Sequence, residues 1–197
     1  MPTVPTIRLA QLLHDVRACR VCEASLPLGP RPVVQLGARA KIVIIGQAPG
    51  TKVHASGVPW DDASGDHLRS WLGLDRDTFY DRQRVAIVPM GFCYPGKKGD
   101  GDAPPRPECA PLWHAPLLSK LPRNALRLLV GQYAQKQYLG RRRKKTLTAT
   151  VEAFESYLPA DFVLPHPSWR SKRWMTKNPW FEARVLPVLQ AAVAART

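Results

Sequence analysis

Short apolar runs alternate along the chain with stretches of amphipathic character. Four runs are rich in branched aliphatic residues, as buried strands are, and cover residues 41–45, 84–92, 126–131 and 162–168. Elsewhere apolar residues recur every three or four positions, which predicts helices over 7–18, 64–74, 107–121, 132–139, 178–195 and, more weakly, 146–158. Pro187 is expected to interrupt the last of these helices. The alternation predicts an α/β fold with three layers, α/β/α, around a central, mostly parallel four-stranded sheet.

The length of the chain suits one domain. Its 197 residues can bury a substantial core, and we expect a single domain over 1–197 with the segment 1–40 packed on it. No window holds the roughly 18 uninterrupted apolar residues of a membrane span, and the N-terminus lacks the apolar core of a signal peptide. We therefore expect a cytoplasmic protein with no membrane partner. We also expect a monomer.

Three predicted strands run directly into loops of glycine, proline and polar residues. These loops are Gly-Gln-Ala-Pro-Gly at 46–50, Gly-Phe-Cys-Tyr-Pro-Gly at 91–96 and His-Pro-Ser-Trp-Arg at 166–170. Ligands of open parallel sheets bind beyond the carboxyl ends of the strands. We therefore expect the three loops to converge on one edge of the sheet and to form the site there.

The charge of the chain suggests a polyanionic partner. It has 29 Lys and Arg against 15 Asp and Glu, a net charge of +14, which favours DNA or RNA over a merely basic, soluble protein. Residues 140–146 contain five consecutive cations, although such a run is also typical of a solvated loop. Residues 166–180 mix cations with tryptophans, so we expect phosphate contacts there and a wedge formed by Met175 or an aromatic residue. The residues expected to bind DNA are Arg170, Lys172, Arg173, Trp174 and Lys177.

Four cysteines form the candidate metal site. Cys19 and Cys22 make a Cys-x-x-Cys pair, and 15 residues separate Cys93 from Cys109. In a cytosolic chain these residues are poor disulfide candidates. Three interpretations stay open on spacing alone: a four-cysteine iron–sulfur cluster, a structural tetrahedral zinc ion, or unrelated buried thiols.

Taken together, these stretches resemble the uracil-DNA glycosylase superfamily, and most closely its iron–sulfur type, family four. That family has Gly-Glu-Ala-Pro-Gly after its first strand, matched here at 46–50, and a later G-x-P-F-x-G-x-A-G segment, matched at 57–65 (GVPWDDASG). It also has a His-Pro-Ser loop, matched at 166–168, and a similar distribution of cysteines. The resemblance spans nearly the whole chain in the same order.

The resemblance implies a DNA repair glycosylase. Such an enzyme hydrolyses the N-glycosidic bond of a flipped uracil or related deaminated or damaged base and leaves an abasic site. The resemblance also implies a [4Fe-4S] cluster, with zinc as the less favoured occupant. The implied ligands are Cys19, Cys22, Cys93 and Cys109.

Roles for individual residues follow from the same resemblance. His166 would donate a hydrogen bond to the base oxygen, and Gln47 with the backbone of its loop would hold the base or the attacking water. Trp60 would stack on the base. The alternatives are that Trp60 is a core residue and that His166 is satisfied within its loop. The expected base-binding residues are Gly46, Ala48, Pro49, Gly50, Trp60 and Ser168.

Two departures from the family pattern leave the reaction open. Gln47 replaces the family's glutamate and is not a base at neutral pH, so positioning of the water passes to Asp62, then Asp61, with Asp66 as a further candidate. Pro89 stands where the family has an asparagine that pairs with uracil. The alternative function is therefore a non-catalytic relative that recognises damaged or single-stranded DNA. A redox protein is a third, weaker hypothesis, because no flavin or nicotinamide fingerprint is present.

Overall fold

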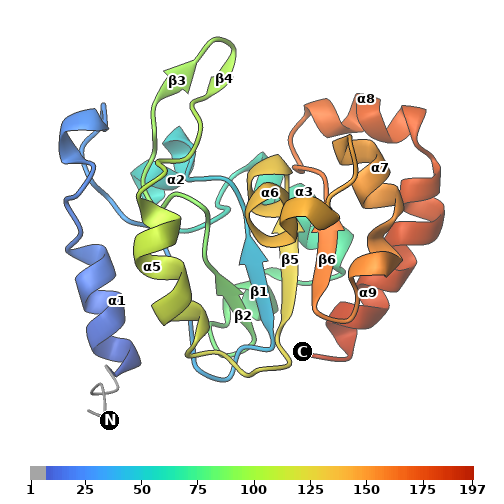
Figure 1. Ribbon diagram of the computed structural model, residues 1–197, viewed down its shortest axis with the longest axis horizontal. Coiled ribbons are helices and arrows are strands. Elements are labelled where there is room, and N and C mark those ends of the chain that lie inside the picture. Colours follow the sequence, from blue (N-terminus) through green and yellow to red (C-terminus); the bar gives the residue numbers. More distant parts are fainter. Residues whose placement is uncertain (1–7) are drawn as a thin grey trace.

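The computed structural model describes residues 8–197 and contains a four-stranded, entirely parallel sheet between helices (Figure 1). The strand order is β2-β1-β5-β6, so the first strand lies inside the sheet. All residues of β1 and β2 are buried, which explains their continuous apolar sequences. The predicted fold class is confirmed. The strands are β1 (Ile42–Ile45), β2 (Val85–Ile87), β5 (Leu126–Val130) and β6 (Asp161–Leu164).

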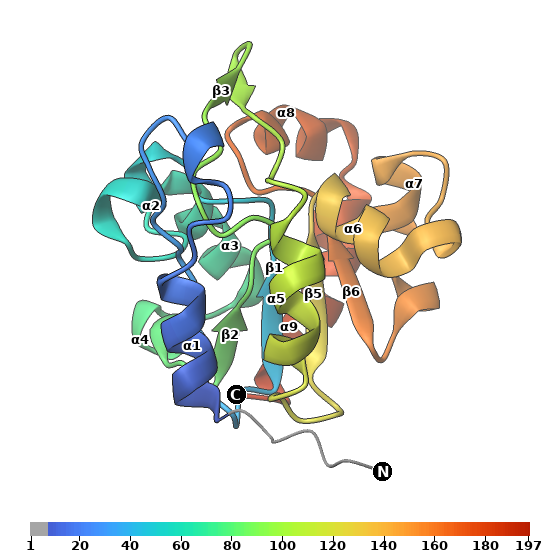
Figure 2. The same cartoon turned by 60° about the vertical axis from the view of Figure 1, so that its left-hand side comes forward.

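Helices cover both faces of the sheet. α5 and α6 lie on one face, with α1 packed against α5, whereas α3 and α9 pack together on the other (Figures 1 and 2). Three apolar residues of α1, Leu12, Leu13 and Val16, are buried in the same core as the sheet. The helices are α1 (Leu9–Arg17), α2 (Thr51–Ser56), α3 (Ala63–Leu72), α4 (Arg76–Tyr80), α5 (Cys109–Leu118), α6 (Gln132–Leu139), α7 (Leu147–Glu152), α8 (Arg170–Lys177) and α9 (Leu186–Ala194).

The structure differs from the predicted elements mainly where segments are short or basic. The helices α2, α4 and α8 and the hairpin formed by β3 (Lys97–Lys98) and β4 (Gly101–Asp102) lie in segments for which the sequence predicts no helix or strand. The second strand ends at Ile87 rather than at residue 92. The fourth ends at Leu164 rather than at residue 168. Residue 7, the first of the predicted N-terminal helix, lies outside the described residues.

Irregular helical turns occur close to Pro187 and within the weakly predicted helix 146–158. A π-helical turn, Phe181–Val185, precedes α9, and Pro187 stands in the first turn of α9, where it needs no N–H partner. The predicted helix 146–158 divides into α7 and the 3-10 turn Phe154–Tyr157. No helix within residues 8–197 is both long enough and apolar enough to span a bilayer.

A buried ion pair fixes the start of the basic run at 140–146. Asp161 is fully buried, and its carboxylate binds Arg127 at 2.7 Å and Arg142 at 3.2 Å. Arg142 also belongs to a 3-10 turn, Gly140–Arg142, so this cation has a structural partner. The following cations at 143–145 are exposed.

Candidate active site

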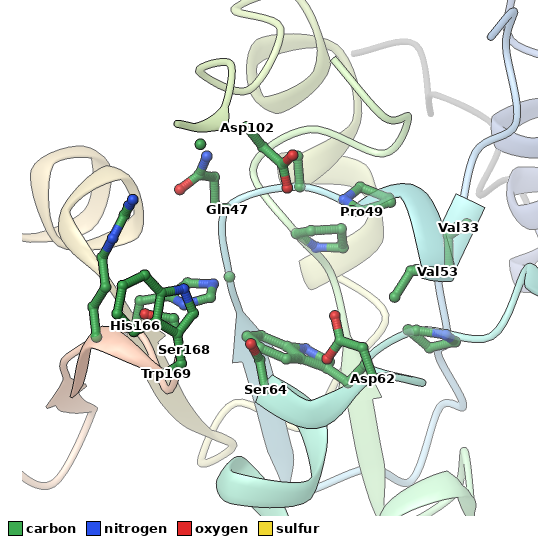
Figure 3. A pocket seen from close by; sticks show the side chains of 18 of the residues that line it. Val33, Gln47, Pro49, Val53, Asp62, Ser64, Asp102, His166, Ser168 and Trp169 are labelled. Carbon is green, nitrogen blue, oxygen red and sulfur yellow. The ribbon is translucent and has the colours of Figure 1, made fainter. Parts of the chain in front are cut away.

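A cavity of about 390 Å³ opens beyond the carboxyl ends of the strands (Figure 3). We call it the strand-end cavity. Most of its lining comes from four parts of the chain: the loop after β1, the turn before α3, the β3–β4 hairpin and the loop after β6. Val33, Val53, Ile87 and Pro89 complete it. Its volume is typical of pockets for small organic ligands. Predicted site residues from three separate motifs line it together: Gly46, Gln47, Ala48, Pro49, Gly50, Trp60, Asp62, His166, Ser168 and Arg170.

The loop after β1 is tied to its neighbours by hydrogen bonds. The carbonyls of Gly46 and Gln47 accept from the N–H groups of Met90 and Gly91, each at 2.9 Å, which joins the loops after β1 and β2. The side chain of Gln47 donates from Nε2 to the carbonyl of Ala103 at 3.2 Å. Its Oε1 is an acceptor that this bond does not use. The amide therefore has a fixed position at the cavity wall.

Two glycines make room for Trp60. A Cβ atom on Gly46 would lie 2.7 Å from Cζ2 of the indole, and one on Gly65 would lie 1.8 Å from the Trp60 carbonyl oxygen. The backbone of Trp60 has φ of 58°, which non-glycine residues rarely adopt. The ring packs on the core and also lines the strand-end cavity, 5.6 Å from the His166 ring between centroids. The two interpretations of Trp60, core residue and cavity wall, therefore describe different sides of one ring.

His166 lines the cavity from the loop after β6. Its backbone carbonyl accepts from the Ser168 N–H at 2.9 Å, which tightens the loop. Burial lowers the pKa of His166 below its ordinary value, while the carboxylates of Asp62 and Asp102 act in the opposite direction. The imidazole is therefore neutral near pH 7, with one N–H to donate and one nitrogen to accept.

Two of the three carboxylates proposed to position water do not line the cavity. Asp61 forms an ion pair with Arg76 at 2.9 Å, and that pairing lowers the pKa of its carboxyl. Asp66 pairs with Arg69 on α3. Because each has a cation as its partner away from the cavity, Asp62 is the carboxylate of this segment that faces it.

Asp62 and Asp102 enter the cavity from opposite sides (Figure 3). Asp62 is the N-cap of α3: its Oδ1 accepts from the Gly65 N–H at 2.9 Å, which leaves Oδ2 for another partner. Asp102 is a site residue that the sequence analysis missed, and it lies on a hairpin that the apolar pattern does not predict. The glycine-rich sequence at 96–101, with Gly99 at φ of 57°, is the turn signal that could have located it.

The basic segment after the His-Pro-Ser loop presents Trp169 and Arg170 at the cavity. Trp169 is 74% exposed, and the Arg170 guanidinium lies over its ring at 5.1 Å from the centroid. Arg170 also donates to the Asp100 carbonyl of the hairpin at 3.5 Å. The predicted cations Lys172, Arg173 and Lys177 lie exposed on α8 and do not line the cavity.

Trp174 and Met175 are poorly placed to act as a wedge. The Trp174 Nε1–H donates to Thr148 Oγ1 at 2.9 Å, and its ring makes edge-on contacts with Trp180 and Phe181. Met175 also packs against the core. These side chains fasten α8 to the body of the protein. The exposed aromatic residue beside the cavity is Trp169 instead.

The four cysteines line a second, small cavity between the segment that follows α1, the loop after β2 and the start of α5, and we call it the cysteine cavity. All four thiols are free. Cys93 and Cys109 are buried, and burial raises the pKa of Cys109 to about 12. Cys19 and Cys22 are half-buried. Among residues 8–197, no three His, Cys, Asp or Glu side chains are arranged to hold a single metal ion.

Comparison with known protein families identifies a matching family. Residues 34–190 match the family model described as Uracil DNA glycosylase superfamily. The match includes the loop after β1, the turn before α3, the β3–β4 hairpin and the loop after β6, which supply most of the lining of the strand-end cavity. It covers most of the chain and begins after the Cys-x-x-Cys pair. The chain belongs to the uracil DNA glycosylase superfamily, and this membership implies a DNA glycosylase acting on uracil-like bases.

Proposed function

We propose that this protein is a monofunctional DNA glycosylase that flips a uracil-like base out of DNA, hydrolyses its N-glycosidic bond and leaves an abasic site. The observation that carries the proposal is the meeting of Gln47, Trp60, Asp62 and His166 in one cavity of about 390 Å³. These residues come from three loops that are far apart in the sequence. Superfamily membership supports the reaction class.

Trp60 and His166 have complementary roles in this proposal. The indole forms the flat surface on which an extruded base stacks, since such stacking stabilises a base outside the helix by about 1–3 kcal/mol. The neutral His166 imidazole donates its N–H to the base oxygen, where negative charge develops as the glycosidic bond breaks. Because the ring is already neutral and beside Trp60, little rearrangement is needed during the reaction.

Asp62 is the residue we assign to the attacking water. The helix N–H of Gly65 occupies one carboxylate oxygen and fixes its position, and the other oxygen can accept a hydrogen bond from water. The water oxygen bonds to the sugar carbon, the carbon–nitrogen bond breaks, and the base departs as an anion. The proton released by the water passes to Asp62.

DNA is the partner that the charge of the protein supports. Arg170 lines the cavity and begins α8, and the exposed cations Lys172, Arg173 and Lys177 follow it on the same helix. Together they can contact phosphates of a DNA strand whose flipped nucleotide enters the cavity. Trp169 projects beside them and can fill the gap left in the stack. This assignment replaces Trp174, which is held by Thr148 and by its aromatic neighbours.

For the cysteine cavity we propose a [4Fe-4S] cluster. The donor set supports it: four thiols from separate segments line one cavity. A zinc ion needs its sulfurs about 2.3 Å from one centre, whereas a cluster distributes the four thiolates over four irons. The space between the thiols is only about 10 Å³, so Cys19 and Cys22, on the less buried side, would have to move outward. A bound cluster would supply a structural cross-link between the N-terminal segment, residue 93 and α5.

An oligonucleotide panel tests the proposed reaction. Each duplex and single strand carries one modified base, and abasic sites are detected as breaks after alkali. We expect breaks with uracil or a related base, and we expect His166→Ala and Trp60→Ala to weaken or abolish them. Breaks that appear without alkali would contradict a monofunctional enzyme. Retention of every base would overturn the proposal.

The same panel tests the second candidate, a DNA-binding relative without activity. Pro89 favours it: this residue lines the cavity, offers no side-chain hydrogen bond, and its carbonyl is bonded to His114 Nε2 at 3.0 Å. That function predicts tight binding to damaged or single-stranded DNA in a gel-shift assay with no base release. Iron and acid-labile sulfide analysis decides separately between cluster and zinc.

A further inference from the structure

Two buried N–H donors without partners line the cysteine cavity. They are Nε of Arg106 and Nε1 of Trp113. Buried polar groups of folded proteins are nearly always hydrogen-bonded, so an unpaired donor calls for an explanation. Only four buried side-chain nitrogen or oxygen atoms in residues 8–197 lack a partner, and two of them are at this one small cavity. Two unpaired donors at one cavity indicate that a hydrogen-bond acceptor binds there.

The position of each donor is fixed by its neighbours in the chain. Trp113 lies four residues after Cys109 on α5, so the two side chains share a face of the helix. Arg106 precedes the same helix, and its Nη2 donates to Glu108 Oε1 at 2.7 Å. The other oxygen of Glu108 accepts from the Cys22 thiol at 3.5 Å. The guanidinium is therefore held beside the thiols by Glu108 and by a hydrogen bond with the Cys22 side chain, while Nε is left without a partner.

Charge gives a second reason for Arg106 to be there. Four thiolates brought into a cavity walled by Leu26, Pro30, Pro32 and Phe92 would be costly without a compensating positive charge. Arg106 is the one cationic residue among those that line the cysteine cavity. N–H donors and positive charge at the sulfurs of an iron–sulfur cluster are also established determinants of its reduction potential.

We propose that Arg106 Nε and Trp113 Nε1 donate hydrogen bonds to the sulfur atoms of the bound cluster, and that they stabilise its reduced form and slow its loss. This inference rests on the proposed cluster and not on the glycosylase reaction. The two residues are positioning residues of the metal site and have no contact with the strand-end cavity.

The test compares substitutions that remove the donors with matched substitutions elsewhere. Trp113→Phe removes the N–H and keeps an aromatic ring, and Arg106→Met removes both donor and charge at similar length. Trp180→Phe and Arg196→Met are the controls, because neither residue lines the cysteine cavity. Iron and acid-labile sulfide are measured in full-length protein, followed by a redox titration and by the decay of absorbance near 400 nm under a chelator.

We expect each donor variant to shift the one-electron equilibrium about tenfold toward the oxidised form, which lowers the potential by about 59 mV. We also expect cluster loss to be several-fold faster, with both controls at wild-type values. Resonance Raman spectra of the wild-type protein in H₂O and D₂O give a test that needs no variant, since exchange of donor hydrogens shifts iron–sulfur bands. Because backbone N–H groups also donate to Cys93 and Cys109, the wild-type spectrum can overturn the inference by showing no shift, and a smaller shift in whichever donor variant folds supports it.

The outcomes separate the two proposals. Wild-type protein without iron and sulfide would overturn the cluster and this inference with it, while leaving the base-release assay untouched. A loaded wild type whose Trp113→Phe and Arg106→Met variants keep their potential and decay rate would overturn this inference alone. The absence of any D₂O shift would do the same.

Discussion

The contact between Gly46 and Trp60 gives the sharpest test of the strand-end cavity. An alanine at 46 would place its Cβ 2.7 Å from Cζ2 of the indole, about 0.7 Å closer than ordinary van der Waals contact permits. Because the ring has the cavity on one side, it can relieve the clash by moving into that space. A displacement approaching 1 Å at a reacting site can cost roughly 100-fold in rate, which is about 2.7 kcal/mol in the activation barrier.

We therefore expect Gly46→Ala to lower kcat/KM for base release about 30- to 100-fold while the melting temperature changes little. Trp60→Phe should also lower it, since phenylalanine stacks less extensively. The double variant should recover part of the loss, because a phenyl ring lacks the atom that clashes. Single-turnover cleavage of one uracil-containing oligonucleotide by the four proteins makes a double-mutant cycle.

Gly101→Ala is the matched control, because it adds the same methyl group to the cavity lining but meets nothing closer than 3.9 Å. Near-wild-type cleavage by Gly46→Ala would refute the assignment of Trp60 to the base. So would simple additivity in the cycle. A large loss of cleavage in the control would show that the cavity tolerates no added volume anywhere. The effect of Gly46→Ala could then not be attributed to Trp60.

Three further predictions concern the other groups of the site. Asp62→Asn should keep the helix cap, since asparagine also caps, and should lower the rate of single-turnover cleavage at least 100-fold. Asp61→Asn should cleave within about twofold of the wild-type rate. Equal losses would contradict the assignment of the water to Asp62. Trp169→Ala should weaken DNA binding in fluorescence titrations by about 1–3 kcal/mol with an unchanged melting temperature. Trp174→Ala should instead lower the free energy of unfolding by roughly 2–4 kcal/mol, because it loses packing and the bond to Thr148. The reverse pattern would restore Trp174 as the wedge. Burial lowers the pKa of His166, so this residue is protonated on the acid side of its usual value near 6.5. The pH–rate profile should therefore show no inflection from it between about pH 7 and 8. An inflection there that His166→Ala removes would contradict a neutral donor.

The sheet could be predicted from sequence because each strand is buried on both faces and therefore apolar throughout. Ile42–Ile45 needs no partner to be recognised, and the loops after parallel strands must meet at one edge. On this basis the sequence predicts that Gln47 and His166 lie at the same edge of the sheet. α2 was not predicted because it is short and buries one residue, Val53. In α8, Ser171, Trp174 and Met175 face the core at helical spacing, but the cations around them made the segment resemble a DNA-binding loop.

The roles of individual tryptophans and aspartates depended on contacts that sequence does not contain. Trp174 is fastened by Thr148, 26 residues away, so its position in a basic segment gave a misleading signal. Asp61 and Asp62 are neighbours of equal chemistry. A cation on α4 takes the first, and the start of α3 orients the second toward the cavity. Which of two adjacent carboxylates faces a ligand is decided by such partners rather than by residue type.

One stretch of chain connects the two cavities. Cys93 and Cys109 bracket the segment 94–108, and within it the β3–β4 hairpin brings Asp102 to the strand-end cavity. The segment is closed on itself by the bond from the Ala103 N–H to the Gly96 carbonyl at 2.8 Å, and the Ala103 carbonyl in turn holds Gln47. Glycine, lysine and aspartate dominate the tip of this hairpin, so it has no core of its own to keep it in place. Its position therefore depends on the bonds from Gln47 and Arg170 and on the two ends of the segment, which adjoin Cys93 and Cys109. A group that fixed these two thiols would also restrain a wall of the cavity in which the base is proposed to bind.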